Sequence, residues 1–126
     1  MEYVTMLIPD ETVRLNQERL DDLRANMGAA AVENVMCRAL EELVQRLSCV
    51  EQYHREARLP EMRKSARSLV ALADQIGMQL LARVARDVTI ALDNDDTVAV
   101  AATLLRLLRI GDASLSEAWQ MRGLSL

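Results

Sequence analysis

Apolar residues recur at helical spacing over most of this chain, and the longest series lies in its first half. Its members follow one another at intervals of three and one, which places them on one face of a helix about seven turns long. The apolar stripe comprises Val32, Val35, Met36, Ala39, Leu40, Leu43, Val44, Leu47 and Val50. The pattern predicts a long amphipathic helix whose end is blurred within the polar stretch 51–58.

Three more helices are predicted after this one, and the residues at their ends support them. Pro60 lies in a first turn, where its missing N–H costs no hydrogen bond, and Gly77 follows the last turn of the same helix. Asp95 or Asp96 is placed to cap the last helix, which we expect to continue past Gly111 because a lone glycine is tolerated. The apolar positions are Leu59, Met62, Ala66, Leu69, Ala73 and Ile76; Leu80, Leu81, Val84, Ala85, Val88, Ala91 and Leu92; and Val98, Ala101, Leu104, Leu105, Leu108 and Ile110.

Two shorter segments precede the long helix. Residues 1–9 end at Pro9 and predict an N-terminal tail. A short helix then begins at Asp10 or Thr12 and ends near Met27, where Gly28 suits the left-handed conformation of a helix end. Short connections make consecutive helices antiparallel neighbours. We therefore predict an all-α fold, an up-down-up-down four-helix bundle with a short extra N-terminal helix, forming a single domain over 10–126.

The composition narrows both the fold and the function. The 126 residues include four Gly and two Pro, too few for the frequent turns of a sheet protein, and 51% are hydrophobic, too many for a disordered chain. With 15 Lys+Arg against 19 Asp+Glu, the net charge of −4 argues against a nucleic-acid partner. No run of about 18 apolar residues is present, so we expect no membrane span.

The two cysteines indicate in which cellular compartment the protein is expected. Cys37 and Cys49 both belong to the long predicted helix. At the helical rise per residue their Cα atoms would lie about 18 Å apart, too far for a disulfide. We expect two reduced, partly buried thiols in a cytoplasmic protein.

Residues that could carry catalysis are scarce. The sequence has no glycine-rich phosphate loop and no Gly-x-Ser-x-Gly motif. Its single histidine, His54, has no cysteine near it in sequence and is interpreted as a solvated surface residue. The acidic run 93–96 lacks the glycine and the distal glutamate of a calcium loop and is interpreted as a connection with a cap. We therefore expect no enzyme, no cofactor and no metal site.

The outer face of the helix over 59–76 is the strongest candidate for a binding surface. Its residues are spaced so that they form one contiguous patch, basic at one end in a chain that is acidic overall. The patch comprises Arg63, Lys64, Arg67, Val70, Ala71 and Asp74. It is either a solvated helix face or a docking surface for an acidic partner with Arg67 at its centre.

The same helix carries a resemblance to a known family. Residues 66–73 read Ala-Arg-Ser-Leu-Val-Ala-Leu-Ala and are followed by Ile76-Gly77. This stretch resembles the Ala-His-x-Leu-Lys-Gly-Ser-Ala signature, followed by Leu-Gly, of histidine-containing phosphotransfer domains, the four-helix modules of bacterial phosphorelays. The segment Leu20-Asp21-Asp22-Leu23-Arg24 with Met27-Gly28 and the acidic connection 93–96 are also similar to that family. The resemblance covers roughly residues 15–120.

The departures from the signature concern its chemistry. Arg67 stands where the family has its phosphoacceptor histidine, and Val70, Ala71 and Leu72 replace its lysine, glycine and serine. A guanidinium stays protonated and cannot accept a phosphoryl group as a histidine nitrogen does. The resemblance therefore implies an inactive phosphotransfer-like module that docks on a response-regulator receiver domain or a histidine kinase through Arg67.

Two alternatives remain beside this expectation. The bundle could be an adaptor or self-association domain unrelated to a phosphorelay, dimerising through exposed Met residues and the apolar tail residues Val4, Met6, Leu7 and Ile8. It could also be an active phosphotransferase that uses His54, a poor substitute because it lies in another helix or loop than Arg67.

Overall fold

The computed structural model describes residues 17–121, which form helices joined by short connections. The helices are α2 (Gln17–Met27), α3 (Ala29–Arg55), α4 (Leu59–Gln75), α5 (Gln79–Asp93) and α6 (Thr97–Met121). This part of the chain is all-α, as predicted. None of its helices is long and apolar enough to cross a membrane. The predicted tail 1–9 and the predicted start of the first helix, at Asp10 or Thr12, lie outside the described residues.

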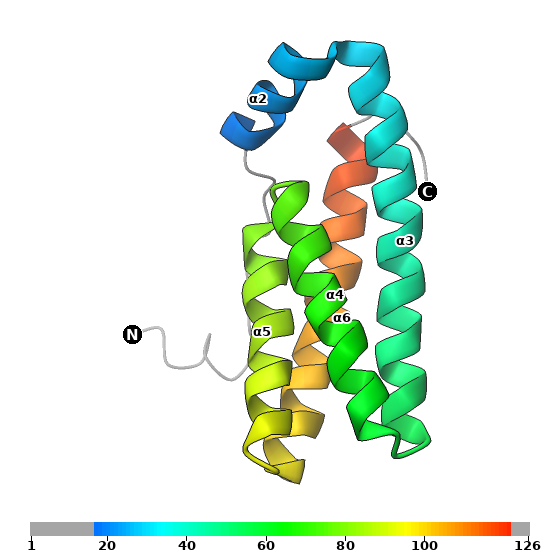
Figure 1. Ribbon diagram of the computed structural model, residues 1–126, viewed down its shortest axis with the longest axis vertical. Coiled ribbons are helices and arrows are strands. Elements are labelled where there is room, and N and C mark those ends of the chain that lie inside the picture. The colour runs from blue at the N-terminus through cyan, green and yellow to red at the C-terminus, as the bar shows by residue number, and fades with distance from the viewer. Residues whose placement is uncertain (1–16, 122–126) are drawn as a thin grey trace.

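Helices α3 to α6 run beside one another, and α2 lies across one end of the molecule (Figure 1). The connections 56–58, 76–78 and 94–96 reverse the chain each time, so consecutive helices are antiparallel. Helix α4 packs against α3 and α5, and α6 packs against α5 and α3. By contrast, no described residue of α4 has its Cα within 8 Å of one in α6. The outer faces of α4 and α6 therefore belong to different sides of the molecule.

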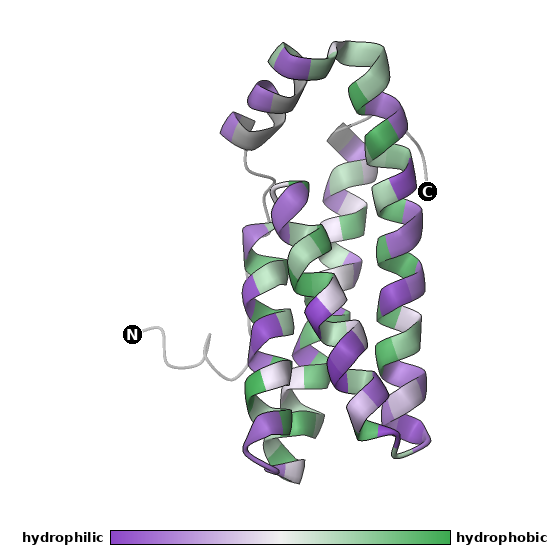
Figure 2. Cartoon of the chain, in the orientation of Figure 1, coloured by the Kyte–Doolittle hydropathy of each residue, from purple (hydrophilic) through white to green (hydrophobic). Residues whose placement is uncertain are grey.

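The core lies between these helices because each buries one apolar face against its neighbours. Hydrophobic and hydrophilic residues alternate along the helices (Figure 2), as amphipathic helices require. The largest fully buried side chains of the core include Leu40 and Leu43 of α3, Met62 and Leu69 of α4, and Leu107 of α6. Burying a side chain of this size contributes about 1.5–3 kcal/mol each, which makes this core the main source of stability.

Helix α6 continues without interruption through Gly111, as predicted. Gly111 is buried against α3, and a Cβ at this position would come within 2.7 Å of Leu47 Cδ1. The missing side chain therefore permits the close approach of α3 and α6 at this level.

Helices α3, α4 and α5 end in the same hydrogen-bonding motif. In α3 the N–H of Arg58 donates to the carbonyl of Tyr53 at 2.8 Å, and equivalent bonds close α4 and α5. The residue before each donor has a positive φ: 56° at Ala57, 80° at Gly77 and 53° at Asp95. The left-handed residue predicted at Gly77 is confirmed. Ala57 occupies the same conformation at the steric cost that a Cβ brings.

The predicted start of α6 is also confirmed at one of its two candidate caps. Asp96 Oδ1 accepts a hydrogen bond of 3.0 Å from the N–H of Ala99. Asp96 is thus the capping residue, whereas Asp95 holds the left-handed position before it.

Several predicted apolar positions are wrong as core positions. In α6, Val98 and Leu105 are 78% and 69% exposed, while Val100 and Leu107, absent from the predicted stripe, are buried. The apolar residues of α6 cover more than one face, and contact with α5 and α3 selects only one of them. Ala101 of α6 is also exposed, and so are three residues at the edges of the other predicted stripes: Val35, Val44 and Leu59.

Candidate functional site

The predicted patch lies on the side of α4 that faces away from the core. The inner face of α4 buries Met62, Ser65, Ala66, Leu69 and Ala73. Lys64, Arg67, Ala71 and Asp74 are exposed, and Arg63 and Val70 are half-buried at the edge. All six predicted residues are therefore accessible to solvent, four of them exposed and two half-buried.

Val70 departs from the expectation that it points away from the core. Its side chain packs against the core cluster and is half-buried. It also lines a hollow between α4 and α5, so it contributes an apolar edge to that hollow instead of a free contact on the outer face.

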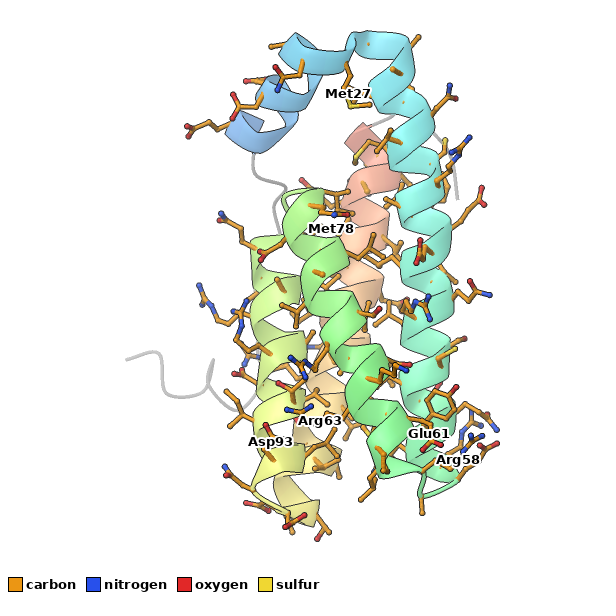
Figure 3. All side chains as sticks on the ribbon, in the orientation of Figure 1. Met27, Arg58, Glu61, Arg63, Met78 and Asp93 are labelled. Carbon is orange, nitrogen blue, oxygen red and sulfur yellow. The ribbon has the colours of Figure 1, made fainter. Side chains whose placement is uncertain are left out.

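Arg63 is engaged with the neighbouring helix. Its Nε donates to Asp93 Oδ1 at 2.5 Å, and a terminal nitrogen donates to Asp93 Oδ2 at 3.2 Å. Figure 3 shows the two side chains meeting between α4 and α5. The hydrogen bonds from Arg63 lower the pKa of the Asp93 carboxyl, and the nearby charge of Arg67 lowers this pKa further. Arg63 therefore joins the two helices beside Arg67, a role that its position in the sequence did not reveal.

The hollow between α4 and α5 measures about 150 Å³ and is lined by Arg67, Val70, Arg86 and Thr89. Both arginines are exposed, and neither forms an ion pair with another residue in the range 17–121. The Thr89 hydroxyl is already used, since it donates to the carbonyl of Arg86 at 2.6 Å. Two guanidinium groups beside an apolar edge make this hollow suitable for a carboxylate or another anion.

Arg86 is the residue that sequence reasoning missed. Its signal is the spacing of Arg83, Arg86, Ile90 and Asp93, which marks the exposed face of α5. This signal identifies a common surface with Arg67 only after α4 and α5 are placed side by side and antiparallel.

Lys64 lies over a different groove from Arg67. A hollow of about 400 Å³ between α3 and α4 is lined by Lys64 together with Arg46, Tyr53, Glu61, Ser65 and Ser68. The predicted patch is therefore divided by the ridge of α4. Arg67 faces α5 and Lys64 faces α3.

The turn before α4 is held by Arg58, which fixes where the patch begins. Arg58 forms ion pairs with Glu56 at 3.5 Å and with Glu61 at 3.2 Å. Its guanidinium also lies 5.0 Å from the centre of the Tyr53 ring. These contacts tie the last turn of α3 to the first turn of α4.

His54 lies apart from the arginine hollow. It is half-buried, not fully solvated as expected, and lines a separate hollow of about 290 Å³ with Leu59, Leu92, Asp95 and Val100. That hollow is formed by the chain reversals after α3 and α5. The structure thus does not bring His54 together with Arg67.

Cys37 and Cys49 are both half-buried, and they do not form a disulfide with each other. Comparison with known protein families, characterised proteins and solved structures finds no match for this chain. The functional argument therefore depends on the geometry of the arginine hollow.

Proposed function

We propose that this chain is a docking module that binds an acidic surface through the arginine hollow of α4 and α5 and accepts no phosphate. The observation that carries the proposal is the pair Arg67 and Arg86, exposed and without an ion-pair partner among the described residues. Two such cations next to an apolar edge favour a partner that offers clustered carboxylates.

The resemblance to phosphotransfer domains identifies the kind of partner. In that reading α3 to α6 form an antiparallel four-helix bundle of the phosphotransfer type, and Arg67 stands at the phosphoacceptor position. The partner is then the receiver domain of a response regulator, whose acidic pocket normally admits a histidine, or a related histidine kinase. A guanidinium enters such a pocket as a counter-ion and not as a nucleophile, because it carries its charge at every working pH.

A titration of the purified chain into receiver domains encoded in its source genome tests this proposal. We expect one or more receivers to bind and an authentic phosphotransfer domain to displace the chain from them. We also expect no transfer of phosphate from a phosphorylated receiver to the chain. The absence of binding to every receiver and kinase tested would contradict the proposal.

The same assay separates the alternative that uses His54. A chain that accepts phosphate on this residue would gain acid-labile phosphate, and His54→Gln would abolish the gain. We expect neither result, since His54 lines a hollow of its own and shares no lining residue with the arginine hollow. The second alternative, self-association, is favoured by a separate observation on α6, whose outer face exposes Val98 and Leu105.

A further inference from the structure

The outer face of α6 carries an apolar stripe that no other described helix covers. Val98 and Leu105 are the two most exposed large apolar side chains in the described part of the chain, at 78% and 69%. Ala101 and Ala102 lie between them and are also exposed. The spacing of these four residues, at three, four and seven positions from Val98, gives a continuous stripe along one helix face.

Charge borders this stripe differently at its two ends. Arg109 is exposed one turn beyond Leu105. At the other end, the exposed acidic connection 93–96 comes just before the first turn of α6. Asp112 is also exposed one turn beyond Arg109, so the first exposed charge after Leu105 is basic and the first exposed charge before Val98 is acidic.

We propose that this stripe, Val98, Ala101, Ala102 and Leu105, binds the same stripe of a second copy of the chain, with the two α6 helices antiparallel. A twofold axis between Ala101 and Ala102 places Val98 of each copy opposite Leu105 of the other. The same axis brings Arg109 of each copy toward the acidic connection 93–96, which precedes α6, in the other copy. A surface with opposite charges at its two ends complements itself only in this antiparallel arrangement.

The alanines make close contact between the helices possible. Small side chains at the centre of the stripe let two helix backbones approach, while Val98 and Leu105 supply the buried apolar surface on either side. Each large side chain occurs twice in the dimer interface, once from each copy. One substitution therefore removes two contacts.

The apolar stripe of α6 and the arginine hollow share no residue. Helices α4 and α6 lie on different sides of the molecule (Figure 1). No described residue of α4 has its Cα within 8 Å of a Cα in α6. A dimer joined through α6 thus presents two arginine hollows. This makes it a bivalent form of the docking module, although the dimer itself does not depend on the proposed function.

Sedimentation equilibrium of the full chain tests the proposal, with Leu105→Gln as the disrupting variant and Ile90→Gln as its control. Ile90 is also half exposed, at 51%, but belongs to α5. We expect the wild-type chain and Ile90→Gln to form dimers as concentration rises, and Leu105→Gln to raise the dissociation constant about a hundred-fold, because two leucines leave the interface. A wild-type chain that stays monomeric, or one whose dimer survives Leu105→Gln, would overturn the proposal.

A charge exchange tests the antiparallel register. Arg109→Glu places a carboxylate near the acidic connection 93–96 of the other copy, and Asn94→Lys places a lysine near its Arg109. Each variant is expected to weaken the proposed dimer. Combining them restores opposite charges, so the double variant is expected to dimerise more tightly than either single variant. A double variant weaker than both would contradict the register. Circular dichroism of each variant identifies any loss of fold.

Discussion

Arg63 of α4 and Asp93 of α5 form a two-point ion pair between residues thirty positions apart in the sequence. The pair lies close enough to Arg67 for the charge of Arg67 to lower the pKa of Asp93 as well. It therefore joins the two helices that form the arginine hollow, and it supplies a negative charge beside a surface that we propose to bind acidic groups.

The pair makes stability dependent on pH in acid. Because the folded protein holds the pKa of Asp93 below its ordinary value, the pair stabilises the fold at neutral pH, and this contribution is lost as the pH falls through the lowered pKa, below about pH 4. Asp93→Asn should lower the melting temperature at pH 7, and the difference from wild type should be smaller at pH 3. Asp74→Asn, at an exposed residue of α4, is the control. An equal difference at both pH values would contradict this account.

The same substitution should strengthen binding. Asp93→Asn removes a negative charge next to Arg67 and releases Arg63 from its partner, so the surface becomes more positive. We expect affinity for an acidic partner to rise about two- to five-fold at low salt, and the gain to shrink as salt screens it. Weaker binding by Asp93→Asn would mean that the ion pair instead holds Arg67 in its binding geometry.

Ala57 provides a test of the helix-end motif. It has a φ of 56°, in the region where glycine avoids the steric cost of a Cβ. Ala57→Gly should therefore stabilise the protein by about 1 kcal/mol in urea unfolding, with the opposite sign expected for Gly77→Ala. Ala71→Gly, at an exposed position inside α4, is the control and should destabilise by about 1 kcal/mol. Destabilisation by Ala57→Gly to the same extent would refute the left-handed assignment.

The effect of a substitution at Gly111 should depend on the size of the side chain at position 47 of α3. In the wild-type protein Gly111→Ala forces Leu47 to move, at a cost of about 1–3 kcal/mol that exceeds the gain in helix propensity. In a Leu47→Ala background the space is open, and Gly111→Ala should stabilise by about 1 kcal/mol. A double-mutant cycle measures this change of sign. The same effect of Gly111→Ala in both backgrounds would exclude a contact between the two positions.

The helices and their ends could be predicted from sequence because their causes are local. Apolar spacing, Pro60, Gly77 and Asp96 act within one or two turns of the residues that they position, and each was found where the pattern placed it. The face of α6 that is buried is determined by contacts with other helices, not by residues nearby in the sequence. Val98 and Leu105 fit a helical stripe, but packing against α5 and α3 buried Val100 and Leu107 instead.

The candidate site was predictable only in part, for the same reason. The exposure of Arg67 follows from the spacing of residues within α4. The engagement of Arg63 by Asp93 and the addition of Arg86 depend on α5 lying beside α4. A single helix pattern contains no information on which residues of a neighbouring helix lie opposite it.

The most direct test of the docking proposal is the affinity of the chain for a receiver domain, measured by calorimetry for wild type, Arg67→Glu and Arg38→Glu. Arg38 is exposed on α3, which does not contact α5, and its reversal changes the net charge by the same amount. The account predicts a loss of about ten-fold or more for Arg67→Glu, because like charges then meet at the contact, and a change within about three-fold for Arg38→Glu. Equal losses for the two variants, or no loss for Arg67→Glu, would contradict it.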